Sequence, residues 1–348
     1  MGNLRSFRRS ARQLASLRNS DDLAELLKID KYRLELLTAR ANYREFRFPK
    51  PKGGYRVIEE PLGPLKNALR ALNDHLQAVY WLERSEVAHG YVRWPEDVPG
   101  PRNIVTNARA HLGCSTLLNV DLDSFFHQVK IPMVENIFCR HPFRFDSKLT
   151  DLVVELTTIH GRLPMGSPTS PALSNLAMRD TDAKLQAWAQ SKSICFTRFV
   201  DDLTFSSREP QNLDGPEFFG TIESMLGTLG FRINQEKVIH YGMKDHKIVT
   251  GLELAADATL PEKFYVELDG DLENLRGSAR AFHLAGDGIE SRWLKRFRQV
   301  VEGRLRFLKM VHGPDDHRYI RALSRFERAV EPPLKEEVLS WLEFQTYD

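Results

Sequence analysis

Two adjacent aspartates, Asp201 and Asp202, are the residues of this sequence best suited to carry chemistry. Apolar and β-prone residues flank them at 194–197 and 203–205, which predicts two strands joined by a tight acidic turn. Neighbouring carboxylates repel each other, so one would stay protonated unless a cation or hydrogen-bond donors held both charges. A divalent metal ion is the usual solution, and an ordinary Asp-rich hairpin turn is the alternative.

A second acidic strand upstream favours the metal. The apolar run 117–120 is followed by Asp121, at the point where a buried strand would reach the surface. Asp123, two residues later, could instead be a carboxylate that only solvent hydrates. An Asp on one strand facing an Asp pair on a neighbouring hairpin is the arrangement of a two-metal phosphoryl-transfer site, in which the metals lie about 3.5–4 Å apart. The sequence therefore predicts such a site at Asp121, Asp201 and Asp202.

Three segments, in this order and spacing, resemble the palm of a reverse transcriptase of the retron type. Residues 121–126 are similar to the family's Asp-x-x-x-Phe-Phe element, 163–171 to its Leu-Pro-Gln-Gly-x-Pro-x-Ser-Pro element, and 199–205 to its Tyr-Ala-Asp-Asp-Leu-Thr element. The resemblance implies an α+β right-hand polymerase with fingers, a palm built on an antiparallel sheet, and a helical thumb. The implied activity is RNA-directed DNA synthesis by nucleotidyl transfer.

The resemblance also implies roles for single residues. Asp121, Asp201 and Asp202, with the backbone carbonyl of Leu122, would hold two Mg²⁺ ions, for which Mn²⁺ can substitute. Phe126 would lie against the sugar of the incoming nucleotide and select deoxyribose. The expected nucleotide-binding residues are Lys52, Arg56, Phe126, Met165, Gly166 and Lys237.

This sequence departs from the family's motifs at three positions. Met165 stands where Gln is usual, so the polar contact of that Gln is missing. Phe199 replaces the usual Tyr and Val200 the usual Ala, which keeps the shape and loses one hydroxyl. Because the expected metal ligands are intact, we still expect polymerase activity despite these departures.

Two further segments resemble the elements that distinguish retron enzymes: Asn107-Ala108-x-x-His111 and Val249-Thr250-Gly251. They imply a cognate structured noncoding RNA, part of which is copied into branched multicopy single-stranded DNA that starts from a guanosine 2′-OH. The implied partners are this RNA and its RNA–DNA product, dNTPs and a separate effector protein of an anti-phage defence system. The expected RNA-binding residues are Asn107, His111, Val249, Thr250, Gly251, Arg292 and Arg296.

The retron-like segments and the class of the protein each allow an alternative interpretation. An Asn and a His four positions apart on a helix are more often a local hydrogen-bonded pair. The chain could be a group II intron maturase or another defence-associated reverse transcriptase, although the segment after Gly251 is little longer than a thumb. An RNA-binding scaffold on an inactive polymerase fold is the alternative of another class, and the three intact aspartates argue against it.

The composition, with 42% hydrophobic and 28% charged residues, is typical of a soluble globular protein. A net charge of +2 does not by itself indicate a nucleic-acid partner, but residues 1–20 carry five Arg and no acid, and 292–309 is also strongly basic. The cysteines, Cys114, Cys139 and Cys195, lack metal-ligand spacing and are predicted to be buried thiols. With no apolar run of membrane-spanning length and no signal peptide, we expect a cytoplasmic protein without membrane contact.

The remaining pattern predicts the elements that position these residues. Helices are expected in 1–44, where Ser20 and Asp30 are candidate caps, and the other expected helices are 65–82, most of 134–162, 170–188, 217–229, 262–282 and 291–311. Residues 46–61 should form a hairpin. The predicted domains are an N-terminal helical extension (1–44), fingers (45–113), palm (114–254, with 134–162 returning to the fingers) and thumb (255–348). In the helix expected at 291–311, the basic residues should lie largely opposite an apolar face formed by Trp293, Leu294, Phe297, Val300, Val301, Leu305 and Leu308.

Overall fold

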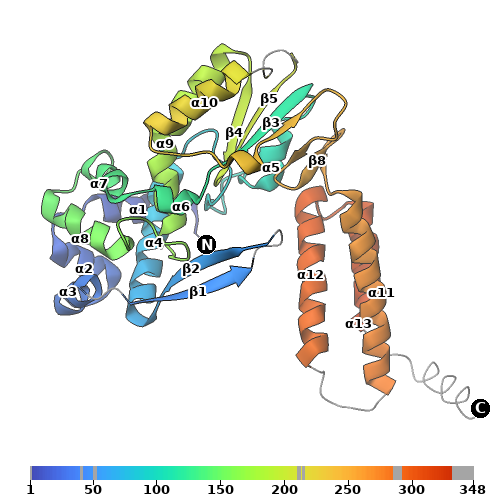
Figure 1. The fold of residues 1–348 in the computed structure, drawn as a ribbon. Helices are drawn as coiled ribbons and strands as arrows, with labels where there is room; N and C mark the ends of the chain where they lie inside the picture. The colour runs from blue at the N-terminus through green and yellow to red at the C-terminus, as the bar shows by residue number, and fades with distance from the viewer. Residues whose placement is uncertain are drawn as a thin grey trace, which may run out of the picture. The chain divides into compact units, whose positions relative to one another are not determined.

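The computed structural model describes residues 2–39, 42–49, 53–209, 213, 216–284 and 292–330 (Figure 1). The chain forms two compact units, residues 1–250 and residues 251–348. The finer domain boundaries within the first unit remain predictions. No helix in the described part of the chain is long and apolar enough to cross a membrane.

Three short helices begin the first unit: α1 (Leu4–Ala15), α2 (Ser20–Leu27) and α3 (Lys31–Ala39). The predicted cap Ser20 is wrong, because Asn19 caps α2 by accepting hydrogen bonds from the backbone amides of residues 21 and 22. Asp30 caps α3 as expected, accepting from Arg33 N at 2.7 Å. Helix α1 packs on α4 (Gly63–Glu83), so its apolar face is covered and its Arg side chains face solvent.

The expected hairpin consists of β1 (Tyr43–Pro49) and β2 (Tyr55–Pro61), paired antiparallel with Phe48 opposite Arg56. Its outer half is exposed, whereas Glu59 is buried. The end of β2 runs directly into α4, whose apolar stripe is buried as the helical spacing predicts. The hairpin is therefore anchored at its base, whereas the described residues farther from the base are exposed.

The first unit contains a four-stranded antiparallel sheet, called the central sheet below, whose strands β3, β4 and β5 are labelled in the upper part of Figure 1. Its strands in spatial order are β4 (Cys195–Phe199), β5 (Asp202–Ser207), β3 (Thr116–Asp121) and β6 (Ile239–Tyr241). One face is covered by α9 (Ser170–Ser191) and α10 (Pro216–Thr228), from which Trp188 and Phe218 contact Phe205. The period-2 alternation of β4 puts Arg198 on this face and Thr197 on the opposite one.

Short elements complete the first unit. They are α5 (Ile104–Arg109), α6 (Phe125–Gln128), α7 (Ile131–Cys139), α8 (Ser147–Thr157), the 3₁₀ turn η2 (Gln235–Lys237) and β7 (Ile248–Val249). Helices α7 and α8 confirm the expected helical character of 134–162. The prediction of buried cysteines is wrong for Cys139, which is exposed at the end of α7, and Cys114 and Cys195 are half-buried.

The second unit contains a small β8–β9 pair and three helices that contact one another. These elements are β8 (Leu252–Leu254), β9 (Ala258–Thr259), α11 (Glu262–Leu284), α12 (Arg292–His312) and α13 (His317–Val330). The sequence interpretation did not include α13. The apolar face expected for α12 is confirmed at Leu294, Val301 and Leu305, which are buried. It is wrong at Trp293 and Val300, which are 60% and 52% exposed.

Candidate active site

The two acidic segments meet at one edge of the central sheet. Asp201 lies in the tight turn between β4 and β5, and Asp202 is the first residue of β5. Asp121, the last residue of β3, is directly opposite Asp202 in the antiparallel register. Beyond it, Leu122 N donates to the Asp201 carbonyl at 3.0 Å. The structure thus brings together the three aspartates that the sequence singled out, from positions 80 residues apart in the chain.

The local electrostatics disfavour three negative charges here. The pKa of Asp202 is raised to about 7, mainly because burial removes hydration and, to a smaller extent, because Asp201 and Asp121 repel its negative charge. The same two causes raise the pKa of Asp201, with Asp121 as the repelling charge. Asp202 still presents accessible surface to solvent, so a dissolved cation can reach it. The arrangement is one that a bound cation would stabilise.

Lys237 already brings positive charge to this edge. Its Nζ donates to both carboxylate oxygens of Asp121, at 3.0 and 2.9 Å. The segment before it is tied to the end of β3, since Asn234 N donates to the Asp121 carbonyl at 2.8 Å. Burial alone would lower the pKa of Lys237, but the hydrogen bond and charge of Asp121 outweigh it and raise that pKa.

The donor set fits divalent cations. Carboxylate oxygens and a backbone carbonyl, that of Leu122, are the ligands that hard cations such as Mg²⁺ prefer. Among the described residues, the ligand atoms of Glu45, Glu59 and His160 lie within 4.8 Å of one another. The carboxylate oxygens of the three aspartates do not all lie that close together. That second cluster is a poor metal site, because Arg162 already neutralises Glu59.

The β1–β2 hairpin contributes Arg56. Burial raises the pKa of both Asp201 and Tyr91, and the positive charge of Arg56 opposes part of that rise. Arg56 is exposed on β2, and so available to a ligand. Lys52, the other nucleotide-binding residue expected in this hairpin, lies outside the described residues. Tyr91, which sequence reasoning missed, stands 6.3 Å from the ring of Phe126, between centroids. Phe126 itself is half-buried on α6, next to the fully packed Phe125.

The Pro-rich segment is fastened to β2 by a residue that sequence reasoning also missed. Glu59 N donates to the Met165 carbonyl at 2.7 Å, and Met165 N donates to Glu59 Oε2 at 3.2 Å. The Glu59 carboxylate in turn accepts two hydrogen bonds from Arg162, at 2.8 and 2.9 Å. Gly166 follows with a φ of +127°, and a Cβ there would lie 2.9 Å from the Glu59 carbonyl oxygen. Only glycine permits this close approach.

The two retron-like segments lie together, although about 140 residues separate them. Helix α5 contacts β7, and Thr250 Oγ1 donates to the Ile104 carbonyl at 3.2 Å. The side chains of Asn107, His111 and Val249 are buried. These three side chains therefore do not form an exposed RNA-binding surface, and any part in RNA recognition would be indirect. Of the other expected RNA-binding residues, Arg292 and Arg296 are exposed on α12 and Gly251 is also exposed.

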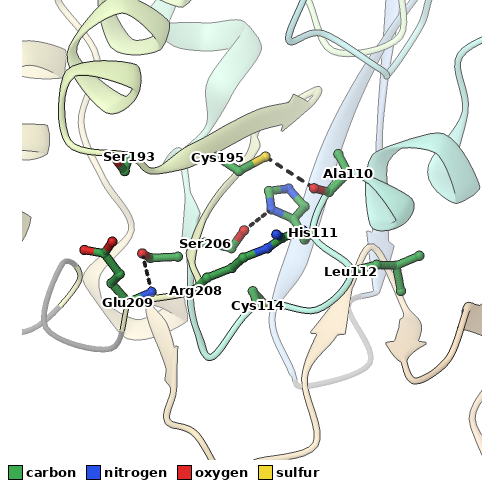
Figure 2. A pocket seen from close by; sticks show the side chains of 10 residues that line it. Ala110, His111, Leu112, Cys114, Ser193, Cys195, Ser206, Arg208 and Glu209 are labelled. Atoms are coloured by element: carbon green, nitrogen blue, oxygen red, sulfur yellow. Dashed lines mark hydrogen bonds between the residues drawn. The ribbon is translucent and has the colours of Figure 1, made fainter.

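His111 connects α5 to the hairpin that carries the aspartates. Its two ring nitrogens are each 2.7 Å from a hydroxyl, Nδ1 from Ser206 and Nε2 from Thr197. Burial lowers the pKa of His111 to about 3, so the ring is neutral at physiological pH. Figure 2 shows the ring at the wall of a ≈ 310 Å³ pocket near Cys195 and Ser206. This pocket is at the opposite end of the hairpin from Asp201, roughly 13 Å along the strands, and so is not the catalytic site.

Comparison with known proteins identifies the class. Residues 48–250 match the family model described as reverse transcriptase (RNA-dependent DNA polymerase). The chain therefore belongs to the reverse transcriptase family, and the predicted right-hand polymerase fold and enzyme class are confirmed.

Its similar curated proteins are of the retron type. The retron Ec86 reverse transcriptase of Escherichia coli is 25% identical and matches over 93% of this chain and 94% of its own length. The retron Mx162 reverse transcriptase of Myxococcus xanthus is 28% identical over 72% of this chain and 56% of its own length. The retron type predicted from the motifs is confirmed. A solved structure of telomerase from Candida albicans has a TM-score of 0.45, at 11% identity over 88% of this chain and 67% of that chain.

Proposed function

We propose that this reverse transcriptase copies part of one structured noncoding RNA into branched multicopy single-stranded DNA, by two-metal nucleotidyl transfer at Asp121, Asp201 and Asp202. The observation that carries the proposal is the register of the central sheet, which sets Asp121 opposite Asp202 and beside the turn with Asp201. Enzymes of this family use divalent metal ions, and we propose two Mg²⁺, replaceable by Mn²⁺. The ligands would be the three carboxylates and the Leu122 carbonyl.

In the reaction, the oxygen of a primer hydroxyl forms a bond to the α-phosphorus of a dNTP. The bond from that phosphorus to the bridging oxygen breaks, pyrophosphate leaves with its electron pair, and the hydroxyl proton passes to solvent. When bound, the metal ions lower the pKa of the hydroxyl and neutralise charge on the triphosphate. Lys237, beside Asp121, and Arg56, within electrostatic range of Asp201, would bind the phosphates.

The priming group would be a guanosine 2′-OH of the RNA itself, as in the retron enzymes that this chain resembles. The contact between α5 and β7 supports this proposal, because it joins the two segments that distinguish the retron type. We propose that these segments hold the hairpin and the neighbouring backbone in the shape that admits a folded RNA. Folded RNA is recognised largely by shape and by 2′-hydroxyl contacts.

Helix α1 offers a surface for the RNA phosphates. Four Arg side chains line a hollow of ≈ 830 Å³ beside Asp97: Arg5, Arg8, Arg9 and Arg12. The exposed Arg292 and Arg296 of α12 would serve a thumb formed by the second unit. Arg-to-Gln changes at the four α1 positions should weaken RNA binding and reduce its salt dependence by a slope of up to about four. An unchanged salt slope would remove α1 from the binding surface.

The proposal is tested by expressing the chain with its neighbouring genomic sequence and isolating small DNA. The expected product is DNA that shortens on ribonuclease or debranching treatment, and Asp201→Asn should abolish it. Efficient copying of arbitrary annealed RNA–DNA primers without such a product would instead indicate a general reverse transcriptase. A role in phage defence with a separate effector protein is proposed from the same resemblance, and phage plating with and without Asp201→Asn tests it.

A further inference from the structure

The turn that carries Asp201 has a conformation that its own sequence disfavours. Phe199 pairs with Asp202, so the hairpin turns through only Val200 and Asp201. Of these two, Val200 alone has a positive φ, at 63°. A two-residue turn with this pattern favours Gly at its first position. A β-branched residue there is strained, so contacts from outside the turn must stabilise it.

One of these contacts comes from Arg198, two residues earlier. Its side chain is 0% exposed, and its Nη1 donates to the Val200 carbonyl at 2.9 Å. Its backbone is fixed as well, because Arg198 N donates to the Val87 carbonyl and His89 N donates to the Arg198 carbonyl, both at 2.8 Å. The guanidinium is therefore attached to a rigid strand and reaches forward to the turn.

Asp182 on α9 holds the guanidinium in this orientation. Arg198 Nε and Nη2 donate to its two carboxylate oxygens, each at 2.7 Å, and Asp182 is also 0% exposed. A bidentate pair of this kind fixes direction as well as charge. Buried ion pairs are often dispensable for stability when both partners are replaced by apolar residues. We therefore look for a role of the pair besides stability, and the guanidinium nitrogen that does not bind Asp182, Nη1, donates to Val200.

Asn175 and Gly90 also lie against the turn or against Arg198. Asn175 Oδ1 accepts from Arg198 Nη1 and its Nδ2 donates to the Gly90 carbonyl, both at 3.0 Å. A Cβ on Gly90 would lie 2.6 Å from Val200 Cγ2 and 2.8 Å from Val200 N. Because Gly90 has no side chain, Val200 has room beside it, and Arg198 binds the Val200 carbonyl.

We propose that Arg198, oriented by Asp182, is a positioning residue that holds the strained Val200–Asp201 turn and thereby places Asp201 and Asp202 for metal binding. This proposal rests on the proposed catalytic function of those aspartates. It assigns to Arg198 no contact with substrate. Its effect should appear in the rate of DNA synthesis and in the metal requirement, and not in template binding.

The test compares full-length variants in primer extension, with Mg²⁺ varied. Arg198→Met combined with Asp182→Leu removes both buried charges at once and leaves no unpaired one. We expect this variant to stay folded and to bind RNA, to lose about tenfold or more in kcat, and to need more Mg²⁺ for half-maximal activity. Adding Val200→Gly, which adopts the positive φ without strain, should restore most of the loss.

A folded double variant with wild-type kcat and Mg²⁺ dependence would overturn the proposal, and so would a triple variant as slow as the double one. If the double variant does not fold, Arg198→Lys replaces it, since Lys keeps the charge beside Asp182 but lacks the planar fork that reaches Val200. The same loss and the same rescue are then expected. Asp201→Asn in the same panel separates the two ideas: synthesis at wild-type rate by that variant would refute the catalytic assignment itself.

Discussion

Gly166→Ala tests whether the close approach of the Pro-rich segment to β2 positions the incoming nucleotide. A Cβ at this position would lie 2.9 Å from both the Glu59 carbonyl oxygen and Ile58 Cγ2. The carbonyl is part of the β2 backbone and cannot rotate away. The backbone φ of +127° adds strain for any residue with a side chain. The substitution must therefore push the segment and the hairpin apart.

The two contributions are each about 1–3 kcal/mol, one for backbone strain and one for overpacking. Their sum, about 4 kcal/mol, corresponds to a loss of roughly 10 °C in Tm for a unit of this size. Gly161→Ala is a matched control, because Gly161 has a φ of +77° but no atom lies within 4 Å of its ideal Cβ. It should cost only about 1 kcal/mol.

The assay is thermal unfolding together with steady-state primer extension on the purified chain. Because Arg56 lies on the same strand as Glu59, displacing β2 should raise the KM for the dNTP in the Gly166 variant. The Gly161 variant should retain the wild-type KM. Equal losses of Tm in the two variants, or an unchanged KM in a folded Gly166→Ala protein, would refute this account of the segment.

Three other predictions follow from the site and its surroundings. Asp201→Asn should lower DNA synthesis by at least about a hundredfold without lowering Tm, since it also removes a repelled charge, while Asp123→Asn should stay close to wild type in primer extension. Phe126→Ala should raise ribonucleotide over deoxyribonucleotide incorporation by about tenfold or more, whereas Phe125→Ala, in the core, should lower Tm and leave sugar choice unchanged, as competition assays would show. The pKa of His111 falls from 6.5 to about 3 in the folded chain, so protons favour the unfolded state between these values, and stability should drop by about 1.4 kcal/mol per pH unit on acidification from pH 6.5. In denaturant unfolding, the free energy of unfolding of His111→Gln should depend less steeply on pH than that of the wild type. Equal pH slopes in the two proteins would assign the effect to other groups.

Much of the site could be predicted from the sequence, because the determining signals are local. The strand pattern around Asp201 and Asp202 requires a tight turn, and the apolar run before Asp121 requires a buried strand that ends there. Helices such as α4 follow from their apolar spacing in the same way. The sequence motifs then ordered these pieces as a polymerase palm.

Local signals failed where a residue's environment comes from elsewhere in the fold. Helix α12 has apolar residues on more than one face, and the helices against which it packs decided that Leu294 is buried and Trp293 is not. Asn107 and His111 were expected to contact RNA because their segment resembles an element of the retron enzymes. They are buried because α5 packs on β7 and because Ser206 and Thr197 face the His111 ring.

The sequence by itself singled out the three aspartates, predicted the strands that meet at them and indicated the class of enzyme that the family match confirms. The tertiary structure decided which charges are paired, as with Glu59 and Arg162, 103 positions apart. It also decided that Arg198, an ordinary basic residue in a strand pattern, is fully buried against Asp182 and reaches the turn. Such pairings depend on side-chain distances across elements that are remote in the chain, and no local pattern of residue types encodes those distances.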